Sequence, residues 1–204
     1  NYFLGIILAM LINKKGVKFK SFYRTLFVLA IAVPQFVSLL VMKNVFAEAG
    51  PVNVLLQELG LISTPLPFFT DPMWARTTII AVNLWIGIPY TMLIVSGILM
   101  NIPDDLYEAA RIDGSGSIHS FFKITLPLIK RNILTTSIFF TMWRMTSFDV
   151  VYAMTSGGPF DSTSLLAYRI YQEAFTNLNL GYASAIAILL FLLMVLMSLI
   201  NLRF

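Results

Sequence analysis

The stretch Glu108-Ala109-Ala110-Arg111-Ile112-Asp113-Gly114, which continues to Ile124-Thr125-Leu126-Pro127, is a polar, glycine-punctuated loop between two long apolar segments. Its local pattern predicts two short helices around a glycine elbow. Pro103-Asp104-Asp105 offers a helix start that places negative charge near the positive end of the helix dipole. Gly114 suits the position after the helix end, where the backbone often has a positive φ and glycine adopts it without a steric penalty. We expect a second helix to begin at Ser117 and to be broken by Pro127.

The distribution of charge around this loop indicates a membrane protein. The chain is 58% hydrophobic and 12% charged, whereas soluble domains carry about 25% charged residues. Uncharged runs of 18, 27 and 29 residues lie between Arg24 and Lys43, between Arg76 and Asp104, and between Glu173 and Arg203. Since a membrane-spanning helix needs about 20 apolar residues, these runs predict three spans. Two weaker candidates are residues 2–12 and 132–154.

Helices are the expected spanning elements, because backbone groups in lipid must find their hydrogen bonds inside the segment. The predicted fold is an all-α, polytopic bundle of transmembrane helices that forms one domain over residues 1–204. The chain begins at Asn1 inside an apolar run, and we expect it to lack its N-terminal part. Pro34 and Pro89 are expected to kink or unwind their spans. Pro51 and Gly60 are expected to begin and end a short interfacial helix.

The basic residues indicate the orientation of the chain. Ten of the fourteen lie on one side of the predicted spans, namely Lys14, Lys15, Lys18, Lys20, Arg24, Arg111, Lys123, Lys130, Arg131 and Arg203. Three fall near the other side: Lys43, Arg76 and Arg169. The positive-inside rule therefore predicts that the loop around Gly114 and the C-terminus are cytoplasmic.

Several function classes have no support in the sequence. The chain has no cysteine, which excludes disulfides and cysteine-based metal sites. It has no Gly-x-x-x-x-Gly-Lys-Ser/Thr run to cradle phosphates. The single histidine, His119, has no companion for metal or triad chemistry and is expected at the surface. We predict no catalytic residue, no metal ligand and no nucleic-acid partner.

The spacing Glu-Ala-Ala, three residues, Gly, nine residues, Ile-x-Leu-Pro resembles the EAA loop of bacterial ABC-importer permeases. The wider sequence resembles MalF-type subunits of carbohydrate importers, with the type I ABC importer permease fold. The motifs that carry this likeness are Tyr23-Arg24-Thr25, Ala32-Val33-Pro34, Asp71-Pro72, Ala75-Arg76, Trp85-Ile86-Gly87-Ile88-Pro89-Tyr90, Ile102–Tyr107, Thr155–Pro159 and Gly181-Tyr182-Ala183. Ser115 departs from the alanine that is commoner in this loop.

The resemblance implies an ATP-driven permease subunit in a bacterial cytoplasmic membrane, crossed several times. It implies a MalG-like second permease, two ATPase subunits that bind ATP and magnesium, and an external solute-binding protein. This chain would bind no cofactor and would take up oligosaccharides. Residues 103–127 would form the cytoplasmic coupling loop, in which the contact with the ATPase is expected from Glu108, Ala109, Ala110, Asp113 and Gly114.

Arg144 is the basic residue placed deep inside a predicted span, and ionisable groups at membrane depth are functional candidates. On a helix, Phe140, Arg144, Ser147 and Val151 fall on one stripe, with Trp143 beside it. The resemblance implies that the sugar site is lined by Ile86, Gly87, Tyr90, Phe140, Trp143, Arg144 and Ser147. Arginine favours an acidic or strongly polar saccharide, although it also donates to neutral hydroxyls. The alternatives are helix packing and an ion pair with the partner permease.

Two other function classes compete with an importer permease. An ion-coupled secondary transporter would also use buried charges and broken helices, but it has no use for the EAA pattern. An intramembrane enzyme would need paired carboxylates, a Ser–His or Cys–His set, or a metal cluster at membrane depth, and the predicted spans offer none of these.

Overall fold

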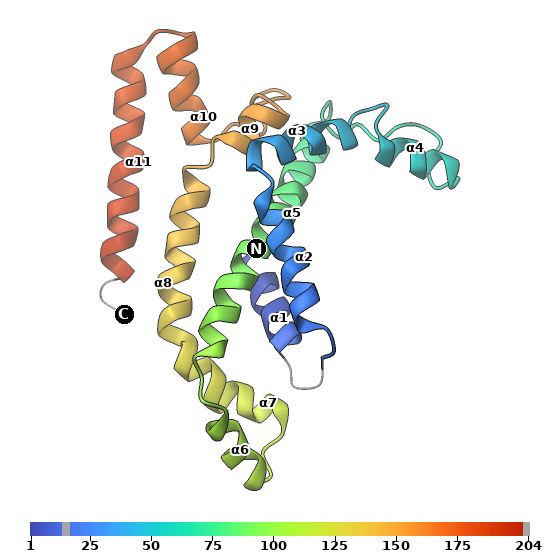
Figure 1. Ribbon diagram of the computed structural model, residues 1–204. Coiled ribbons are helices and arrows are strands. Elements are labelled where there is room, and N and C mark those ends of the chain that lie inside the picture. The colour runs from blue at the N-terminus through green and yellow to red at the C-terminus, as the bar shows by residue number, and fades with distance from the viewer. Residues whose placement is uncertain (14–16, 202–204) are drawn as a thin grey trace. The chain divides into compact units, whose positions relative to one another are not determined.

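The computed structural model describes residues 1–13 and 17–201, and within this part of the chain every regular element is helical (Figure 1). The elements are α1 (Tyr2–Asn13), α2 (Lys20–Ala32), α3 (Gln35–Val45), α4 (Pro51–Glu58), α5 (Pro72–Met100), α6 (Asp104–Ile112), α7 (Ser117–Ser120), η1 (Phe121–Thr125), α8 (Leu126–Met145), α9 (Asp149–Met154), α10 (Leu166–Tyr171), η2 (Gln172–Thr176) and α11 (Leu180–Asn201). The two η segments are π-helical turns. The predicted all-α fold is confirmed.

The chain divides into two compact units. Unit 1 comprises residues 1–31, 87–141 and Met197 onward, and unit 2 comprises residues 32–86 and 142–196. The helices α5, α8 and α11 each contribute to both units, since divisions fall at residues 86/87, 141/142 and 196/197.

The core of unit 1 joins α1 to the C-terminal half of α5. Its fully buried residues are Ala9, Ile12, Met92 and Val95, and Phe27 of α2 packs against them. Gly5 allows this close approach, because a Cβ built there would lie 2.5 Å from the Cβ of Thr91. Small residues at helix contacts are the usual means by which membrane helices approach each other closely.

The core of unit 2 joins α3, the N-terminal half of α5, and α9. Its buried residues are Leu39, Val82, Val150, Ala153 and Met154. Beside this core, the fully buried Asn53 ties α4 to the loop before α5. Its Nδ2 donates to the carbonyl oxygens of Ala47, Glu48 and Leu66, and its Oδ1 accepts from the Leu66 amide at 2.8 Å.

Two described helices, α5 and α11, are long and apolar enough to cross a membrane, which agrees with two of the three predicted spans. The third predicted span is a broken pair, α2 and α3, which qualifies only if the two helices are counted together. The break falls at Pro34, as expected from a residue that lacks an amide donor. In contrast, Pro89 lies inside α5, which continues through it.

The weaker candidates differ from their predicted form. α1 is apolar but short. The expected continuous span over 132–154 is wrong, because α8 ends at Met145 and α9 starts at Asp149. Thr146 Oγ1 lies 3.1 Å from the carbonyl oxygens of both Met142 and Trp143. Hydrogen bonds from a side chain to the backbone compete with the helical ladder at such places.

The short helix predicted from Pro51 is confirmed as α4. Pro51 occupies its first position, and Gly60 follows its end with φ +67°. Among the basic residues used to predict the topology, Lys14, Lys15 and Arg203 lie outside the described residues. Lys18, Lys20, Arg24, Arg111, Lys123, Lys130 and Arg131 all belong to unit 1, whereas Lys43, Arg76 and Arg169 belong to unit 2.

Candidate functional site

The predicted glycine elbow is present in unit 1. α6 follows Pro103, and its first turn carries Asp104 and Asp105. The helix ends at Ile112, and Gly114 has φ +75°. The backbone then turns back, because the Ser115 amide donates to the Ala110 carbonyl at 2.8 Å. A Cβ at Gly114 would meet no atom within 4 Å, so the requirement for glycine comes from the backbone angle rather than from lack of space.

The second short helix begins at Ser117, as predicted, but Pro127 does not break it. α7 leads into the π-helical turn η1, and η1 leads into α8, so that Pro127 is the second residue of that helix. In the π-helical turn, the Leu126 amide bonds to the Phe121 carbonyl, five residues back. This turn falls just before the proline, whose missing amide would interrupt a regular α-helical ladder.

The two short helices are joined by a side-chain contact that the sequence pattern did not reveal. The Tyr107 hydroxyl of α6 lies 2.8 Å from Thr125 Oγ1, which is buried at the end of η1. On α7, Ser120 Oγ donates to the Gly116 carbonyl at 3.1 Å. These bonds fix the loop as a folded knob at one end of unit 1.

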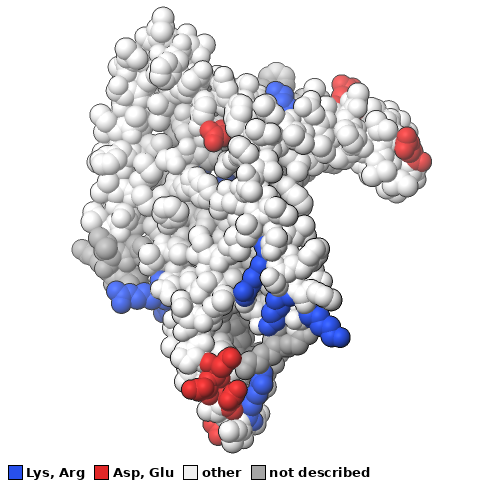
Figure 2. Space-filling view, in the orientation of Figure 1, with Lys and Arg blue, Asp and Glu red and all other residues white. Residues whose placement is uncertain are grey.

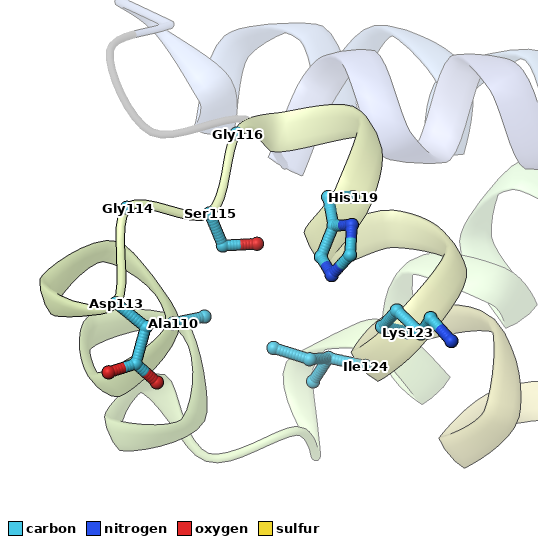
Figure 3. Close-up of a pocket in the computed structure, with 8 residues that line it drawn as sticks. All are labelled: Ala110, Asp113, Gly114, Ser115, Gly116, His119, Lys123 and Ile124. Atoms are coloured by element: carbon cyan, nitrogen blue, oxygen red, sulfur yellow. The ribbon is translucent and has the colours of Figure 1, made fainter.

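The knob holds a cleft of about 490 Å³ (Figure 3). One wall is formed by α6 and its end, with Ala110 and Asp113. The other wall is formed by α7 and η1, with His119, Lys123 and Ile124. Gly114, Ser115 and Gly116 form the turn between the walls. The cleft therefore offers a carboxylate on one side and nitrogen-bearing side chains on the other. His119 and Lys123 were missing from the predicted contact set, because their position depends on how α7 folds back on α6.

The remaining predicted residues of the contact set, Glu108 and Ala109, are exposed on α6. Glu108, Asp104, Asp105 and Asp113 are all exposed, and acidic side chains gather over the tip of the unit that α6 forms (Figure 2). The structure thus places the five predicted coupling residues on one short helix and its elbow, while their contact with an ATPase stays a prediction.

The predicted sugar-site residues are divided between the units. Gly87, Tyr90 and Phe140 belong to unit 1, and Ile86, Trp143, Arg144 and Ser147 belong to unit 2. In unit 1, Phe140 is 8% exposed, and its ring centroid lies 5.9 Å from that of Tyr2 on α1. Gly87 is buried, and its carbonyl accepts a hydrogen bond from Thr91 Oγ1 at 3.1 Å. Phe140 therefore contributes to the packing of α1 on α8.

In unit 2, Arg144 stacks on Trp143, with its Cζ 5.0 Å from the centre of the ring. Its Nε and Nη2 atoms are shielded from solvent. Ile86 packs against the core of the unit. The expected stripe from Phe140 through Ser147 to Val151 on one helix is wrong, because the break after Met145 separates the last two from α8. The binding role of all seven residues stays a prediction.

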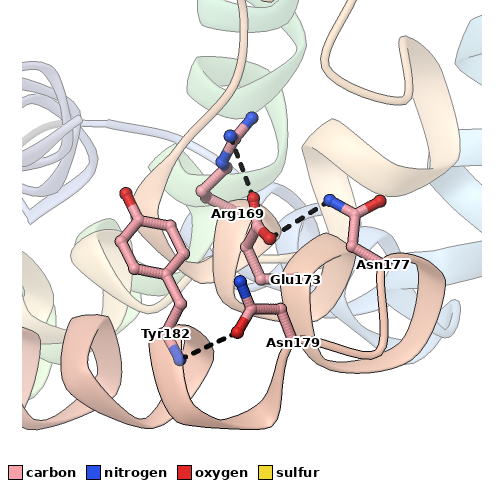
Figure 4. Close-up of polar contacts among 5 residues, drawn as sticks. All are labelled: Arg169, Glu173, Asn177, Asn179 and Tyr182. Carbon is pink, nitrogen blue, oxygen red and sulfur yellow. Dashed lines mark hydrogen bonds and ion pairs between the residues drawn. The ribbon is translucent and has the colours of Figure 1, made fainter.

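A polar cluster in unit 2 escaped the sequence reasoning. Glu173, only 5% exposed, forms an ion pair with Arg169 at 2.9 Å and accepts a hydrogen bond from Asn177 Nδ2 at 3.1 Å (Figure 4). The Asn179 amide donates to the Glu173 carbonyl at 2.7 Å, and Asn179 Oδ1 accepts from the Tyr182 amide at the start of α11. The spacing of Arg169 and Glu173, four residues apart on a helix, was the available signal.

Beside this cluster, five aromatic side chains pack together on α9, α10 and their flanks: Phe148, Tyr152, Tyr168, Tyr171 and Phe175. The Phe148 ring is stacked on that of Tyr152 at 4.9 Å and on that of Tyr168 at 6.1 Å. Hydrogen bonding with Tyr152 raises the pKa of Tyr171 above its ordinary value.

Curated relatives of similar sequence share one description. The chain is 39% identical over 212 residues to the maltose/maltodextrin transport system permease protein MalF of Klebsiella aerogenes, with 98% of this chain and 41% of that protein covered. It is 38% identical to the same-named protein of Escherichia coli K12, with the same two coverages. The chain thus spans about two fifths of the length of the relatives that it matches.

Two solved structures share the fold. A bacterial ABC transporter involved in the import of the acidic polysaccharide alginate matches with a TM-score of 0.86 at 21% identity, over 99% of this chain and 72% of the other. The alginate transporter in complex with an alginate pentasaccharide-bound periplasmic protein matches with a TM-score of 0.83 at 22% identity, over 98% and 70%. The family model for the binding-protein-dependent transport system inner membrane component matches residues 1–204, and the chain belongs to that family.

Proposed function

We propose that this chain is a permease subunit of an ATP-driven ABC importer that takes up oligosaccharides. The observation that carries the proposal is the folded knob of α6, α7 and η1, with its glycine elbow and its cleft. A transport subunit that binds no nucleotide needs a rigid cytoplasmic element through which a separate ATPase can move it. The family membership supports this reading.

In this proposal the cleft between α6 and η1 receives a segment of the ATPase subunit, which binds ATP and magnesium. The exposed Glu108 presents negative charge to that partner, and Asp113, His119 and Lys123 flank the contact. Charges at the rim of an interface fix its register and speed association more than they add affinity. The elbow at Gly114 keeps the two walls at a fixed spacing.

The proposed assembly contains a MalG-like second permease, two ATPase subunits and an external solute-binding protein, in the cytoplasmic membrane of a bacterium. This chain crosses the membrane several times, with the knob on the cytoplasmic side. The distribution of basic residues supports this orientation. Seven described lysines and arginines belong to unit 1, some of them at the ends of the knob, and the positive-inside rule places such residues in the cytoplasm.

For the substrate, the relatives are named for maltose and maltodextrin, and the structural neighbours are described as importing alginate, an acidic polysaccharide. We assign saccharide binding to Ile86, Gly87, Tyr90, Phe140, Trp143, Arg144 and Ser147. Arg144 stacked on Trp143 combines a cation with an aromatic face. A guanidinium binds a carboxylate through two parallel hydrogen bonds, so this pair favours an acidic saccharide.

The test is reconstitution of the chain with its partner permease, ATPase and solute-binding protein in proteoliposomes, followed by measurement of saccharide uptake. Uptake should require ATP and the binding protein. Glu108→Lys should lower both uptake and stimulated ATP hydrolysis by about tenfold, which corresponds to about 1.4 kcal/mol of lost interaction. Glu58→Lys, a reversal of an exposed charge on α4, is the matched control and should keep the wild-type rate.

Two outcomes would contradict the proposal. Normal stimulation of ATP hydrolysis by the Glu108→Lys variant would remove the coupling role of the knob. Uptake that proceeds without ATP and collapses with an ion gradient would favour an ion-coupled secondary transporter instead.

A further inference from the structure

The loop between α9 and α10 in unit 2 has an unusual backbone. Ser156, Phe160 and Asp161 all have φ values between +50° and +55°. Side chains other than glycine seldom adopt this left-handed region, and a bulky residue such as phenylalanine does so least readily. Such residues persist only where the surrounding structure holds them, and they cluster at functional sites.

Hydrogen bonds supply this restraint. The buried Thr163 donates through Oγ1 to the Gly158 carbonyl at 2.8 Å and through its amide to the Gly157 carbonyl at 3.1 Å. Its Oγ1 also lies 2.8 Å from Thr155 Oγ1, which closes the loop across its base. Arg76 Nε of α5 donates to the Ser162 carbonyl at 2.8 Å, so the loop is also tied to a neighbouring helix.

Packing restrains the loop from a second side. Gly157 is buried, and a Cβ built on it would lie 2.8 Å from Cε1 of Tyr168. The left-handed backbone of this glycine, at φ +83°, therefore lies directly against the aromatic ring. The loop is held in one conformation by its own bonds and by α10.

This restrained loop presents an aromatic ring to its surroundings. Phe160 is 93% exposed, the highest value among the large hydrophobic residues described, and Asp161 beside it is exposed as well. Asp161 carries the single charge between Asp149 and Arg169. An exposed phenylalanine next to one carboxylate, on a loop rich in serine and threonine, has the composition of an interface anchor surrounded by a polar rim.

We propose that Phe160 and Asp161 form a docking point for the external solute-binding protein. The proposal rests on the function proposed above and on the predicted orientation, in which Arg169, shortly after this loop, lies near the side opposite the knob. The loop is already ordered, so that association would cost little conformational entropy. The matching surface on the binding protein should be an apolar pocket with a lysine or arginine at its edge.

A soluble protein suits this pair better than lipid does. Aromatic residues that anchor a chain at the membrane surface are mainly tryptophan and tyrosine, whose polar groups reach the headgroup region. Anionic headgroups attract lysine and arginine, and Asp161 would be repelled by them. The carboxylate therefore points to a cationic protein surface as the partner of the loop.

The experiment uses variants that keep the left-handed backbone. Phe160→Gly removes the ring at a position where glycine is unstrained, and Asp161→Asn removes the charge with a residue that tolerates positive φ. The assembled importer in lipid nanodiscs is titrated with its saccharide-loaded binding protein. We expect the Kd to rise about tenfold or more for Phe160→Gly, as for a central anchor residue. For Asp161→Asn we expect a rise of about threefold, mainly through a slower association rate that responds less to salt.

Phe175→Ala is the matched control, since Phe175 is also an exposed phenylalanine of unit 2, outside this loop. It should bind with the wild-type Kd. A wild-type Kd for Phe160→Gly would overturn the docking proposal. If the wild-type importer shows ATP hydrolysis stimulated by the binding protein, that failure would concern the docking point alone. A wild-type importer without such stimulation would remove the proposed function and the docking point together.

A fluorescence experiment distinguishes contact of Phe160 with the binding protein from contact with lipid or with another importer subunit. The Phe160→Trp variant is placed in nanodiscs that contain brominated phospholipid, and the spectrum of the wild-type importer, whose permease chain contains Trp74, Trp85 and Trp143, is subtracted. Fluorescence that shifts to the blue only when the binding protein is added supports the proposal. Quenching by the brominated lipid in the absence of the binding protein would assign Phe160 to the membrane and overturn it. A blue-shifted, unquenched signal that the binding protein does not change would assign the residue to a contact with another importer subunit and would overturn it too.

Discussion

The exposed cations around the knob of unit 1 and three arginines of unit 2 differ in their contacts. In unit 1, Arg111, Lys123, Lys130 and Arg131 are exposed around the knob and the start of α8. In unit 2, three cations are each held in a specific contact: Arg76 with the Ser162 carbonyl, Arg169 with Glu173, and Arg144 with the Trp143 ring. Around the knob it is the number of basic residues that predicts the orientation of the chain. In unit 2 each of these three arginines has its own specific contact.

One glycine from each unit shows a similar contrast between an open and a packed position. Gly114 has a left-handed backbone with open space around its Cα, whereas Gly157 has a left-handed backbone and an aromatic ring against it. Gly114 therefore needs only a residue that adopts a positive φ, whereas Gly157 also needs the absence of a side chain. Substitutions in each unit can test this contrast.

The largest expected effect is the all-or-none labelling of two introduced cysteines, which reports the side of the membrane on which each one lies. Cysteines are introduced by Ile118→Cys in the knob and by Leu166→Cys in unit 2, two positions whose side chains are 77% and 49% exposed. An impermeant thiol reagent should label the first only from the cytoplasmic side and the second only from outside, because of the positive-inside bias. Residues 1–204 contain no cysteine, so this chain without either substitution provides the unlabelled background. Labelling of both positions from the same side would reject the predicted orientation.

The second prediction compares the two glycines. Gly157→Val should destabilise the protein by about 3 kcal/mol, because it adds a strained left-handed residue to a steric clash with Tyr168. Gly114→Val should cost about 1–2 kcal/mol, since only the backbone angle opposes it. Thermal unfolding in the same detergent measures both. Equal losses would show that the space around Gly157 is irrelevant to stability.

The third prediction compares a held cation with an exposed one. Arg169→Gln leaves the buried carboxylate of Glu173 with Asn177 as its remaining side-chain partner in the cluster of Figure 4. We expect a loss of about 2 kcal/mol, below the range for a fully buried pair because Arg169 is itself 43% exposed. Lys130→Gln in unit 1 should change stability by less than about 0.5 kcal/mol. Similar melting temperatures for the two variants would contradict the contrast between the units.

The sequence predicted those features of the knob that depend on local chemistry. The helix start at Pro103, the positive φ of Gly114 and the start of a second helix at Ser117 are all present. The same holds for α4 between Pro51 and Gly60. Each of these depends on the backbone preference of one residue, which a sequence displays directly.

Features that depend on competition or on tertiary contacts were not predictable in the same way. The helix passes through Pro127, with a π-helical turn just before it, and it ends at Met145, next to a threonine whose hydroxyl bonds to helical carbonyls. The walls of the cleft depend on how α7 folds back on α6, which brings His119 opposite Asp113. The division into two units follows from contacts between distant segments, which a hydropathy pattern does not encode.

The last prediction concerns Arg144, the cation of unit 2 that was assigned to substrate. A cation at membrane depth costs about 2.5 kcal/mol or more, which a water-filled path lined by polar substrate would lower. Arg144→Gln keeps a hydrogen-bond donor but loses the charge and the contact of a cation with the Trp143 ring. Uptake of an acidic oligosaccharide should fall about tenfold relative to a neutral one, since each 1.4 kcal/mol of differential binding is a factor of ten. The measurement is competitive uptake in proteoliposomes, with assembly of the complex quantified separately. Equal loss of both sugars together with failed assembly would instead assign Arg144 to a structural contact, as for Arg169.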